Sequence, residues 1–224
     1  MVVPVGLECE EGPDALASPA CAMPTSMVLD GGPTRAEILQ WRKSERERLI
    51  GERLALGPAL RRQHGERIAA TLDALLPRLE GSVVSLYWPF RGEPDLRDWA
   101  EGVYRRGGRC VLPVVVAKAT PLVFRAWRSG DAMERSVWNI PIPAEGEELR
   151  PDIVIAPLVG FDRLGYRLGY GGGFFDRTLA GLAPRPRAIG VGYALAAMAT
   201  IHPLAHDIGM NAIVTEDGLV WGSL

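Results

Sequence analysis

A glycine-rich segment between Asp152 and Leu182 contains the residue types most capable of chemistry in this chain. It reads DIVIAPLVGFDRLGYRLGYGGGFFDRTLAGL, with an apolar stretch, a run of glycines and a helix-forming end. In an arrangement of strand, glycine loop and helix, backbone N–H groups can approach phosphate oxygens, while the helix N-terminus adds partial positive charge. The segment therefore predicts a site for an anionic ligand.

Two side chains make that prediction more specific. Arg167 stands just before the glycines, where it can pair with a phosphate, and Asp176 falls in the first turn of the expected helix, where a phosphate would sit. Two anionic groups within about 4 Å repel each other unless a cation lies between them, so the pair indicates Mg²⁺ bridging carboxylate and phosphate. This pattern favours a nucleoside triphosphate.

A simpler interpretation stays open at this point. No Lys followed by Ser or Thr comes after the glycines, and Phe174 occupies the last glycine position of a G-x-G-x-x-G motif, so neither common phosphate-loop pattern fits. The glycines could instead supply positive φ in a tight turn, with Asp176 only complementing the helix dipole.

The composition of the chain indicates a globular protein without a strongly charged partner. The chain has 224 residues, 47% of them hydrophobic, and its 25 basic and 27 acidic residues leave a net charge of -2. A nucleic-acid groove or an anionic membrane surface would usually show as excess Lys and Arg, so we expect no nucleic-acid and no membrane partner. The three cysteines form no Cys-x-x-Cys pair, which argues against a disulfide framework or a zinc site.

The chain also lacks the usual signals for membranes and secretion. No run of about 18 apolar residues is present, and the start MVVPVGLECEEG lacks a basic region followed by a long apolar core. We therefore expect a cytoplasmic protein, and we expect it to be a monomer.

The N-terminal part divides into a tail and two helices. Residues 1–33 contain five prolines, no Lys or Arg and no periodicity, which predicts a flexible tail. Thr34 suits the N-cap of a helix that ends at Gly57 and Pro58. A second helix, with apolar residues at spacings of three and four, is expected to end around Pro77.

Beyond Ser82, short apolar runs rich in β-branched residues alternate with helices and turns. Between the first two runs, PDLRDWAEGVYRRGG predicts a helix with Pro94 at its first position and a stop at Gly107 and Gly108. Strand, helix, strand at this spacing implies a largely parallel sheet covered by helices, in a single α/β domain over residues 34–224. The strand-like runs are residues 82–88, 109–116, 121–127, 152–159, 187–193 and 211–215.

The motif around the glycines resembles that of the 5-formyltetrahydrofolate cyclo-ligase family. The family hallmark is a Phe-Asp pair followed by R-L-G-x-G-x-G, two aromatic residues and Asp; here Phe161 and Asp162 precede RLGYGGGFFD. Three further stretches agree in order and spacing, namely YWPFRGEPD, SVWNIPIP and HDIGMNAIVTE. The resemblance covers roughly residues 35–221. It implies a three-layer α/β fold and an ATP- and Mg²⁺-dependent cyclisation of 5-formyltetrahydrofolate to 5,10-methenyltetrahydrofolate, with release of ADP and phosphate.

The resemblance also implies roles for individual residues. Arg167 and Glu93 would be catalytic, with Glu93 orienting the folate, while Asp176 and Asp207 would lie at the metal. The implied ATP-binding residues are Arg42, Arg46, Arg167, Gly169, Gly171, Gly172 and Gly173. The implied folate-binding residues are Trp88, Glu93, Trp138, Tyr170 and Phe174.

Several of these residues have a purely structural alternative. Glu93 precedes Pro94 and could simply lie at the start of a helix, with no role in binding. Trp138 could be an ordinary core aromatic residue. Arg42 and Arg46 lie in a segment dense with Glu, where i,i+4 ion pairs on a solvated helix face are the default.

Four positions depart from the commonest family pattern and leave rival functions open. Arg42 replaces the usual lysine, and Gly172 stands where some relatives have lysine. Phe174 and Phe175 replace a pair of tyrosines, which removes a hydroxyl from the expected pocket. The rivals are a family member that uses ATP and magnesium on another pterin or heterocycle, and a non-catalytic folate-binding protein.

Overall fold

A seven-stranded sheet forms the centre of the structure, a computed structural model that describes residues 32–223. In sheet order its strands are β12 (Gly218–Gly222), β11 (Ala212–Thr215), β9 (Arg187–Val191), β6 (Ile153–Pro157), β1 (Val83–Ser85), β2 (Arg109–Val114) and β3 (Val123–Ala126). The five strands from β11 to β2 are parallel, and β12 and β3 pair antiparallel at the edges. The predicted, mostly parallel sheet is confirmed.

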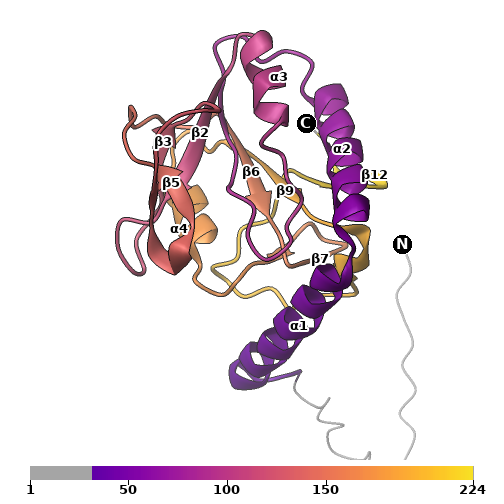
Figure 1. The fold of residues 1–224 in the computed structure, drawn as a ribbon. Helices are drawn as coiled ribbons and strands as arrows, with labels where there is room; N and C mark the ends of the chain where they lie inside the picture. Colours follow the sequence, from indigo (N-terminus) through magenta and orange to yellow (C-terminus); the bar gives the residue numbers. More distant parts are fainter. Residues whose placement is uncertain (1–31, 224) are drawn as a thin grey trace, which may run out of the picture. The chain divides into compact units, whose positions relative to one another are not determined.

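Helices cover both faces of this sheet (Figure 1). On one face lie α2 (Pro58–Leu75) and α3 (Trp99–Arg105), and on the other lies α4 (Phe174–Gly181). Successive residues of a strand point to opposite faces. Accordingly, Ile155 of β6 joins the core under α2 and α3, while Ala156 joins the core under α4. These are the three layers of an α/β domain.

The first helix, α1 (Arg35–Ala55), has a different character because most of it is exposed. Leu49 is its buried apolar residue and packs in a small separate core with Val159, Leu168 and Ile201. The other buried side chains of α1 are two arginines, Arg42 and Arg53. This helix therefore presents charge, more than apolar surface, to the body of the protein.

A small hairpin lies between strand β6 and the glycine loop in the chain. The strands β7 (Gly160–Asp162) and β8 (Arg167–Leu168) pair antiparallel, and β10 (Ala197–Met198) adds a third strand. The carboxylate of Asp162 holds the turn by accepting hydrogen bonds of 3.0–3.1 Å from the backbone N–H groups of Leu164, Tyr166 and Ile201. The expectation that β6 leads directly into the glycine loop is therefore wrong.

Four other short elements lie outside the main sheet. The strands β4 (Met133–Arg135) and β5 (Pro141–Pro143) form a two-stranded sheet, with the 3-10 turn η1 (Val137–Asn139) between them. A second 3-10 turn, η2 (Ala194–Ala196), follows β9.

The helix expected to begin at Pro94 begins instead at Trp99. The hydroxyl of Tyr87 donates a hydrogen bond of 2.7 Å to the carbonyl of Pro94, and the side chain of Asp95 accepts one from the N–H of Arg97. These hydrogen bonds hold the backbone near Pro94 in a non-helical conformation, so α3 begins five residues further along, at Trp99. The predicted stop at Gly107 and Gly108 agrees with the end of α3 at Arg105.

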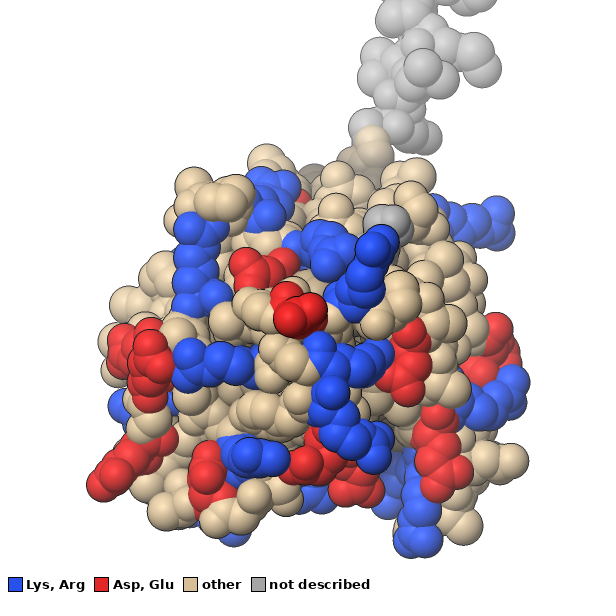
Figure 2. Space-filling view, turned by 90° about the horizontal axis from the view of Figure 1, so that it is seen from above, with Lys and Arg blue, Asp and Glu red and all other residues tan. Residues whose placement is uncertain are grey.

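The remaining expectations about the outer parts of the chain are tested only in part. Within residues 32–223, no helix is both long enough and apolar enough to cross a membrane. On the face seen in Figure 2, basic and acidic side chains are interspersed and form no large area of one sign. The flexible tail predicted for residues 1–33 lies almost entirely outside the described residues, whereas the described residues from Arg35 onward form one compact unit.

Candidate active site

A cavity of about 410 Å³ lies where three parallel strands end. Its walls include Trp88 after β1, Pro113 near the end of β2 and Pro157 at the end of β6. The chain places β2 on one side of β1 and β6 on the other, and such a reversal of strand order is the usual position of ligand sites in open α/β sheets. Every residue that the sequence analysis assigned to a site lines this cavity.

The lining divides into two parts by chemistry. We call one the cationic part; it consists of Arg42, Arg46, Arg167, Asp176, Asp207 and the glycines Gly169, Gly171, Gly172 and Gly173. We call the other the aromatic part; it consists of Trp88, Glu93, Trp138, Tyr170 and Phe174.

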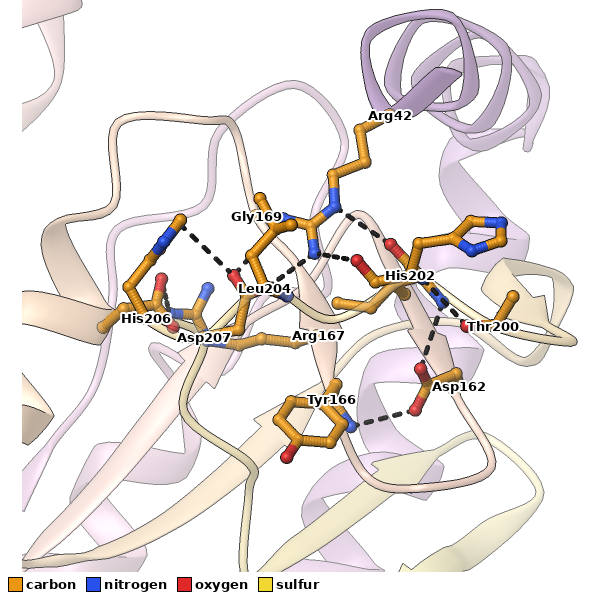
Figure 3. Close-up of polar contacts among 12 residues, drawn as sticks. Arg42, Asp162, Tyr166, Arg167, Gly169, Thr200, His202, Leu204, His206 and Asp207 are labelled. Carbon is orange, nitrogen blue, oxygen red and sulfur yellow. Dashed lines mark hydrogen bonds and ion pairs between the residues drawn. The ribbon is translucent and has the colours of Figure 1, made fainter. Parts of the chain in front are cut away.

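Arg42 anchors the cationic part through a buried ion pair with Asp207 (Figure 3). Its Nη2 lies 2.5 Å from Asp207 Oδ2 and its Nη1 lies 3.3 Å from Oδ1. The guanidinium also donates to the carbonyls of Ile201 and His202 at 2.9 and 2.8 Å. Arg42 is only 4% exposed, so its placement on a solvated face is wrong.

The solvent-facing ion pairs of α1 involve other residues. Arg48 is half-exposed and pairs with Glu45 at 2.6 Å and with Glu52 at 2.7 Å. The helix thus separates its charges into an exposed face and a buried face.

The pKa of Asp207 is set by two opposing effects. Burial raises the pKa of this carboxyl group, whereas hydrogen bonds from Arg42 and from the N–H of Leu204 lower it. The lowering effects outweigh burial, so the pKa of Asp207 lies below its usual value. Asp207 is therefore an ionised carboxylate whose oxygens already accept several hydrogen bonds.

Arg46 lies one turn beyond Arg42 and contacts the glycine loop. Its Nε donates a hydrogen bond of 2.6 Å to the carbonyl of Gly169. Gly171 adopts φ +95, and a Cβ at this position would lie 3.4 Å from the Arg46 guanidinium carbon. Burial, followed by the charge of Arg42, lowers the pKa of Arg46. The loop therefore packs its backbone against a half-buried cation.

Arg167 brings a second guanidinium to the same loop. Its Nη2 lies 3.1 Å from Asp176 Oδ2, and a Cβ on Gly169 would lie 2.8 Å from its Nη1. Among the described residues, its buried Nε has no hydrogen-bond partner. A buried donor without an acceptor is costly, and an anion in the cavity would satisfy it.

The helix α4 begins directly after the glycines. Gly173 is its N-cap residue, with φ 64, and has no side chain that could occupy the N–H groups of the first turn. Those N–H groups and the positive end of the helix dipole favour a bound anion.

Asp176 keeps free acceptor capacity on both carboxylate oxygens. Its Oδ2 accepts from Arg167 and its Oδ1 accepts from the N–H of Ile208 at 3.1 Å, so each oxygen keeps a lone pair. No three His, Cys, Asp or Glu side chains converge on one point within residues 32–223. Mg²⁺ usually takes one or two carboxylates together with substrate phosphates, so Asp176 beside a phosphate site fits this ion.

Glu93 is the acidic group of the aromatic part, and it is 5% exposed. Its Oε2 accepts a hydrogen bond of 2.8 Å from the N–H of Phe90, and its Oε1 accepts one of 2.9 Å from the Tyr170 hydroxyl. Burial raises the pKa of Glu93 to about 7, although Arg53 and these two hydrogen bonds oppose the rise. Because α3 starts at Trp99, the interpretation of Glu93 as a helix start is wrong.

Trp138 forms part of the cavity wall and is not a core residue. It is 57% exposed, it adopts φ 60 within η1, and its ring meets the ring of Phe174 edge-on at 5.7 Å. Trp88 is partly buried, and the guanidinium of Arg97 lies 4.6 Å from its ring centre. The aromatic part therefore offers ring faces beside one buried acid.

Arg53 is not among the predicted site residues, although it is 3% exposed and contacts the aromatic part. Its Nη2 donates a hydrogen bond of 2.6 Å to the hydroxyl oxygen of Tyr170. A helical signal was available, since Arg42, Arg46, Leu49 and Arg53 follow the i, i+4, i+7, i+11 spacing of one helix face.

The fold and the cavity together define a class: an α/β protein whose ligand site, at the reversal of strand order, joins a glycine loop with arginines to a buried acid among aromatic rings. Residues 38–216 match the model of the 5-formyltetrahydrofolate cyclo-ligase family. The chain belongs to this family, and it is an enzyme of the ligase class.

Individual relatives agree with this assignment. The 5-formyltetrahydrofolate cyclo-ligase of Escherichia coli K12 is 33% identical over 133 residues, which are 57% of this chain and 73% of that protein. The one of Mycolicibacterium smegmatis is 30% identical over 181 residues, 76% of this chain and 91% of that protein. The solved structure of Aquifex aeolicus 5,10-methenyltetrahydrofolate synthetase has a TM-score of 0.68 at 27% identity, covering 80% of this chain and 91% of that one.

Proposed function

We propose that this enzyme converts 5-formyltetrahydrofolate to 5,10-methenyltetrahydrofolate with Mg-ATP, releasing ADP and phosphate. The single observation that carries the proposal is the joining of the cationic and aromatic parts in one cavity. A triphosphate and a folate both need to enter such a reaction, and each finds a chemically suitable wall.

The reaction needs ATP because a formamide is a poor electrophile and its oxygen is a poor leaving group. The formyl oxygen attacks the γ-phosphorus, the bond to the bridging oxygen breaks and ADP leaves. The N10 amine then attacks the formyl carbon of the resulting iminium phosphate and loses its proton, and the C–O bond breaks to release phosphate. Such a sequence requires positioning and charge neutralisation more than a covalent nucleophile.

The cationic part would bind the triphosphate. Arg167 lines the cavity and has a buried donor without a partner among the described residues, and Arg46 covers the backbone of Gly171. The N–H groups after Gly173 add further donors. We assign Arg42 to support this site, because its donors are engaged by Asp207 and two carbonyls.

The magnesium ion would be held mainly by Asp176, with Asp207 nearby. When bound, the ion neutralises phosphate charge that the arginines alone leave uncompensated. Asp207 contributes through its ion pair with Arg42, since its oxygens already accept several donors.

The aromatic part would bind the folate. An ionised Glu93 can accept hydrogen bonds from the N–H groups of a pterin ring. Trp88, Tyr170 and Phe174 offer ring surfaces for stacking, and Trp138 extends over the opening on η1. Because Phe174 and Phe175 have no hydroxyl, we assign charge stabilisation at the phosphorylated oxygen to Arg167.

Absorbance of 5,10-methenyltetrahydrofolate tests the proposal. Purified protein is incubated in four mixtures: one complete with 5-formyltetrahydrofolate and Mg-ATP, one without ATP, one with EDTA, and one with Mg-ATP but no folate. We expect product and ADP in equal amounts in the complete mixture alone. Product without ATP would refute the mechanism, and folate binding without ADP formation would refute catalysis of this reaction.

Activity on a different pterin has a distinct signature in the same assay. ADP would form with that compound and not with 5-formyltetrahydrofolate. The expectations of a cytoplasmic, monomeric enzyme without nucleic-acid or membrane partners stay predictions.

A further inference from the structure

One buried arginine of α1, Arg53, is hydrogen-bonded to the aromatic part. Arg53 lies about two helical turns beyond Arg46 on the same side of the helix. Its Nη2 donates a hydrogen bond of 2.6 Å to the Tyr170 hydroxyl oxygen, and Tyr170 in turn lies 2.9 Å from Glu93 Oε1. A buried cation is therefore linked to a buried acid through one phenol.

The chemistry of the three groups gives this link a direction. A guanidinium has donors only, so the Tyr170 oxygen must be the acceptor in its bond with Arg53. The single phenolic proton is then available for Glu93 Oε1 at 2.9 Å or for the carbonyl of Phe90 at 3.3 Å. A charged acceptor at the shorter distance forms the stronger bond. The link is therefore complete when Glu93 is an ionised acceptor.

The surrounding backbone keeps Arg53 in this position. Its Nε donates to the carbonyl of Arg91 at 3.0 Å and its Nη1 donates to the carbonyl of Leu158 at 3.3 Å. Arg91 and Gly92 both have positive φ, 48 and 77, so the chain turns sharply just before Glu93. The turn that presents Glu93 is thus tied to the same guanidinium.

We propose that Arg53 is a positioning residue, which acts through Tyr170 to keep Glu93 ionised and directed into the cavity. The consequence for folate binding rests on the proposed function, whereas the link itself can be tested without any substrate.

Groups that face Glu93 from other elements do not titrate near neutral pH. Burial raises the pKa of Tyr170 and the pKa of Tyr87, and it raises the pKa of Tyr193 to about 12. The pKa of Asp95 is lowered, because bonds from Arg97 outweigh its burial. The charged group that acts on Glu93 itself is Arg53, while Asp95 acts on Tyr87, and Arg61 and Glu216 act on Tyr193. His64 packs against Tyr193 and pairs with Glu216, so the transition of Glu93 is identified by its loss in Glu93→Gln.

Replacing Arg53 should raise the pKa of Glu93 still further. We expect Arg53→Met to raise it by about one unit or more, which lowers the ionised fraction roughly tenfold at pH values below both pKa values. Arg53→Lys retains the charge and should give a smaller rise. Arg48→Met is the matched control, because Arg48 lies on the exposed face of the same helix and pairs with Glu45 and Glu52.

Tyr170→Phe is the second variant, because Arg53→Met also removes two bonds to backbone carbonyls and could prevent folding. The phenylalanine interrupts the link and leaves those two bonds intact. It should raise the pKa of Glu93 as well, and the double variant should add little to the larger single effect.

The decisive experiment is a carbon-13 NMR titration of glutamate carboxyl groups in the ligand-free protein, with Glu93 assigned by its loss in Glu93→Gln. An increase of about one unit in Arg53→Met or Tyr170→Phe, and none in Arg48→Met, would support the proposal. A Glu93 pKa within about 0.3 of wild type in folded Arg53→Met and in Tyr170→Phe would overturn it.

The assay with 5-formyltetrahydrofolate separates this proposal from the proposed function. If the wild type forms no product and the Glu93 pKa still increases in the variants, the function fails and the role of Arg53 stands. If the wild type is active, kcat/KM of Arg53→Met should recover toward wild type between pH 6.5 and 8.5, roughly tenfold. A loss that is equal at all pH values would indicate a purely structural role and contradict the proposal.

Discussion

The two parts of the cavity each contain a carboxyl group shielded from solvent, partly for Asp207 and fully for Glu93, and the pKa values of these groups shift in opposite directions. Burial raises the pKa of both, yet the pKa of Asp207 ends below its usual value, whereas that of Glu93 is raised to about 7. Arg42 hydrogen-bonds Asp207 directly with two nitrogens, while Arg53 is hydrogen-bonded to Tyr170 and lowers the pKa of Glu93 by its charge. Asp207 is also only partly buried, whereas Glu93 is fully buried, so direct contact with a cation outweighs burial at Asp207 and a more distant cation only reduces its effect at Glu93.

This difference lets one cavity hold two kinds of charge. The cationic part keeps permanent charges suited to phosphate, and the aromatic part keeps an acid that titrates near neutral pH. Similar pairs of carboxyl groups with separated pKa values mark acid and base roles in many enzymes.

The largest expected effect concerns the ion pair of the cationic part. Asp207→Asn leaves the buried charge of Arg42 without its partner, which should lower the free energy of unfolding by about 3–5 kcal/mol. Urea unfolding at pH 7 measures this. Glu52→Gln, which removes an exposed partner of Arg48, should cost less than about 1 kcal/mol. Equal costs for the two variants would remove the contrast between buried and exposed pairs.

The wild-type contribution of Asp207 should also depend on pH. The pKa of Asp207 is lower in the folded protein than in the unfolded chain. Its contribution to the free energy of unfolding is therefore fully present at a pH above the unfolded-state pKa, and it is lost as the pH falls through the folded-state pKa. The difference in stability between wild type and Asp207→Asn should therefore shrink in acid.

A change at the proposed metal ligand should affect turnover more than stability. Asp176→Asn keeps the shape of the side chain and removes its charge, so kcat should decrease roughly 10²- to 10³-fold. Asp217→Asn, at a 62% exposed aspartate 3.8 Å from Arg67, is the control and should retain activity. Normal turnover in Asp176→Asn would exclude its metal role.

In the aromatic part, removal of charge should stabilise the fold. A rise in pKa from 4.5 to about 7 means that the folded protein retains a proton that the unfolded chain releases, so Glu93 destabilises the fold increasingly over this pH interval. Glu93→Gln should therefore be more stable than wild type at pH 8, by up to about 3 kcal/mol, and nearly equal to it at pH 4.5. Urea unfolding at both pH values tests the sign, and a less stable variant at pH 8 would contradict it.

The smallest expected effect belongs to the aromatic wall. Trp138→Ala removes an exposed ring that meets Phe174 edge-on, and such contacts contribute about 0.5–1.5 kcal/mol. KM for the folate should increase roughly two- to twelvefold, with little change in KM for ATP. An equal increase in both constants would mean that the two parts of the cavity are not separate sites.

The sequence predicted the sheet and the list of cavity residues better than their interactions. The runs of β-branched residues at 152–159 and 187–193 correctly predicted β6 and β9, because a short buried strand is recognisable from its own residue types. The edge strand β12 (Gly218–Gly222) was missed, since a short glycine-bounded run lacks that signal. The helix start at Pro94 failed because a tertiary bond from Tyr87 competes with the local preference.

The pKa contrast could not be read from the sequence for the same reason. Arg42 and Asp207 are 165 positions apart, and their pairing depends on the fold. Arg53 belongs to none of the family motifs named above. The sequence indicates its position only through its spacing from Arg42 and Arg46 on one face of the helix. The predicted site residues converged on one cavity, but Arg53, whose charge lowers the pKa of Glu93, was not among them.

A crystal structure with a non-hydrolysable ATP analogue, Mg²⁺ and 5-formyltetrahydrofolate would test the central claim most directly. The account predicts the β- and γ-phosphates against the amides of Gly169 to Gly173 and Arg167, with the pterin ring hydrogen-bonded to Glu93. A triphosphate bound in the aromatic part, or a glycine loop without phosphate in the presence of bound folate, would contradict it.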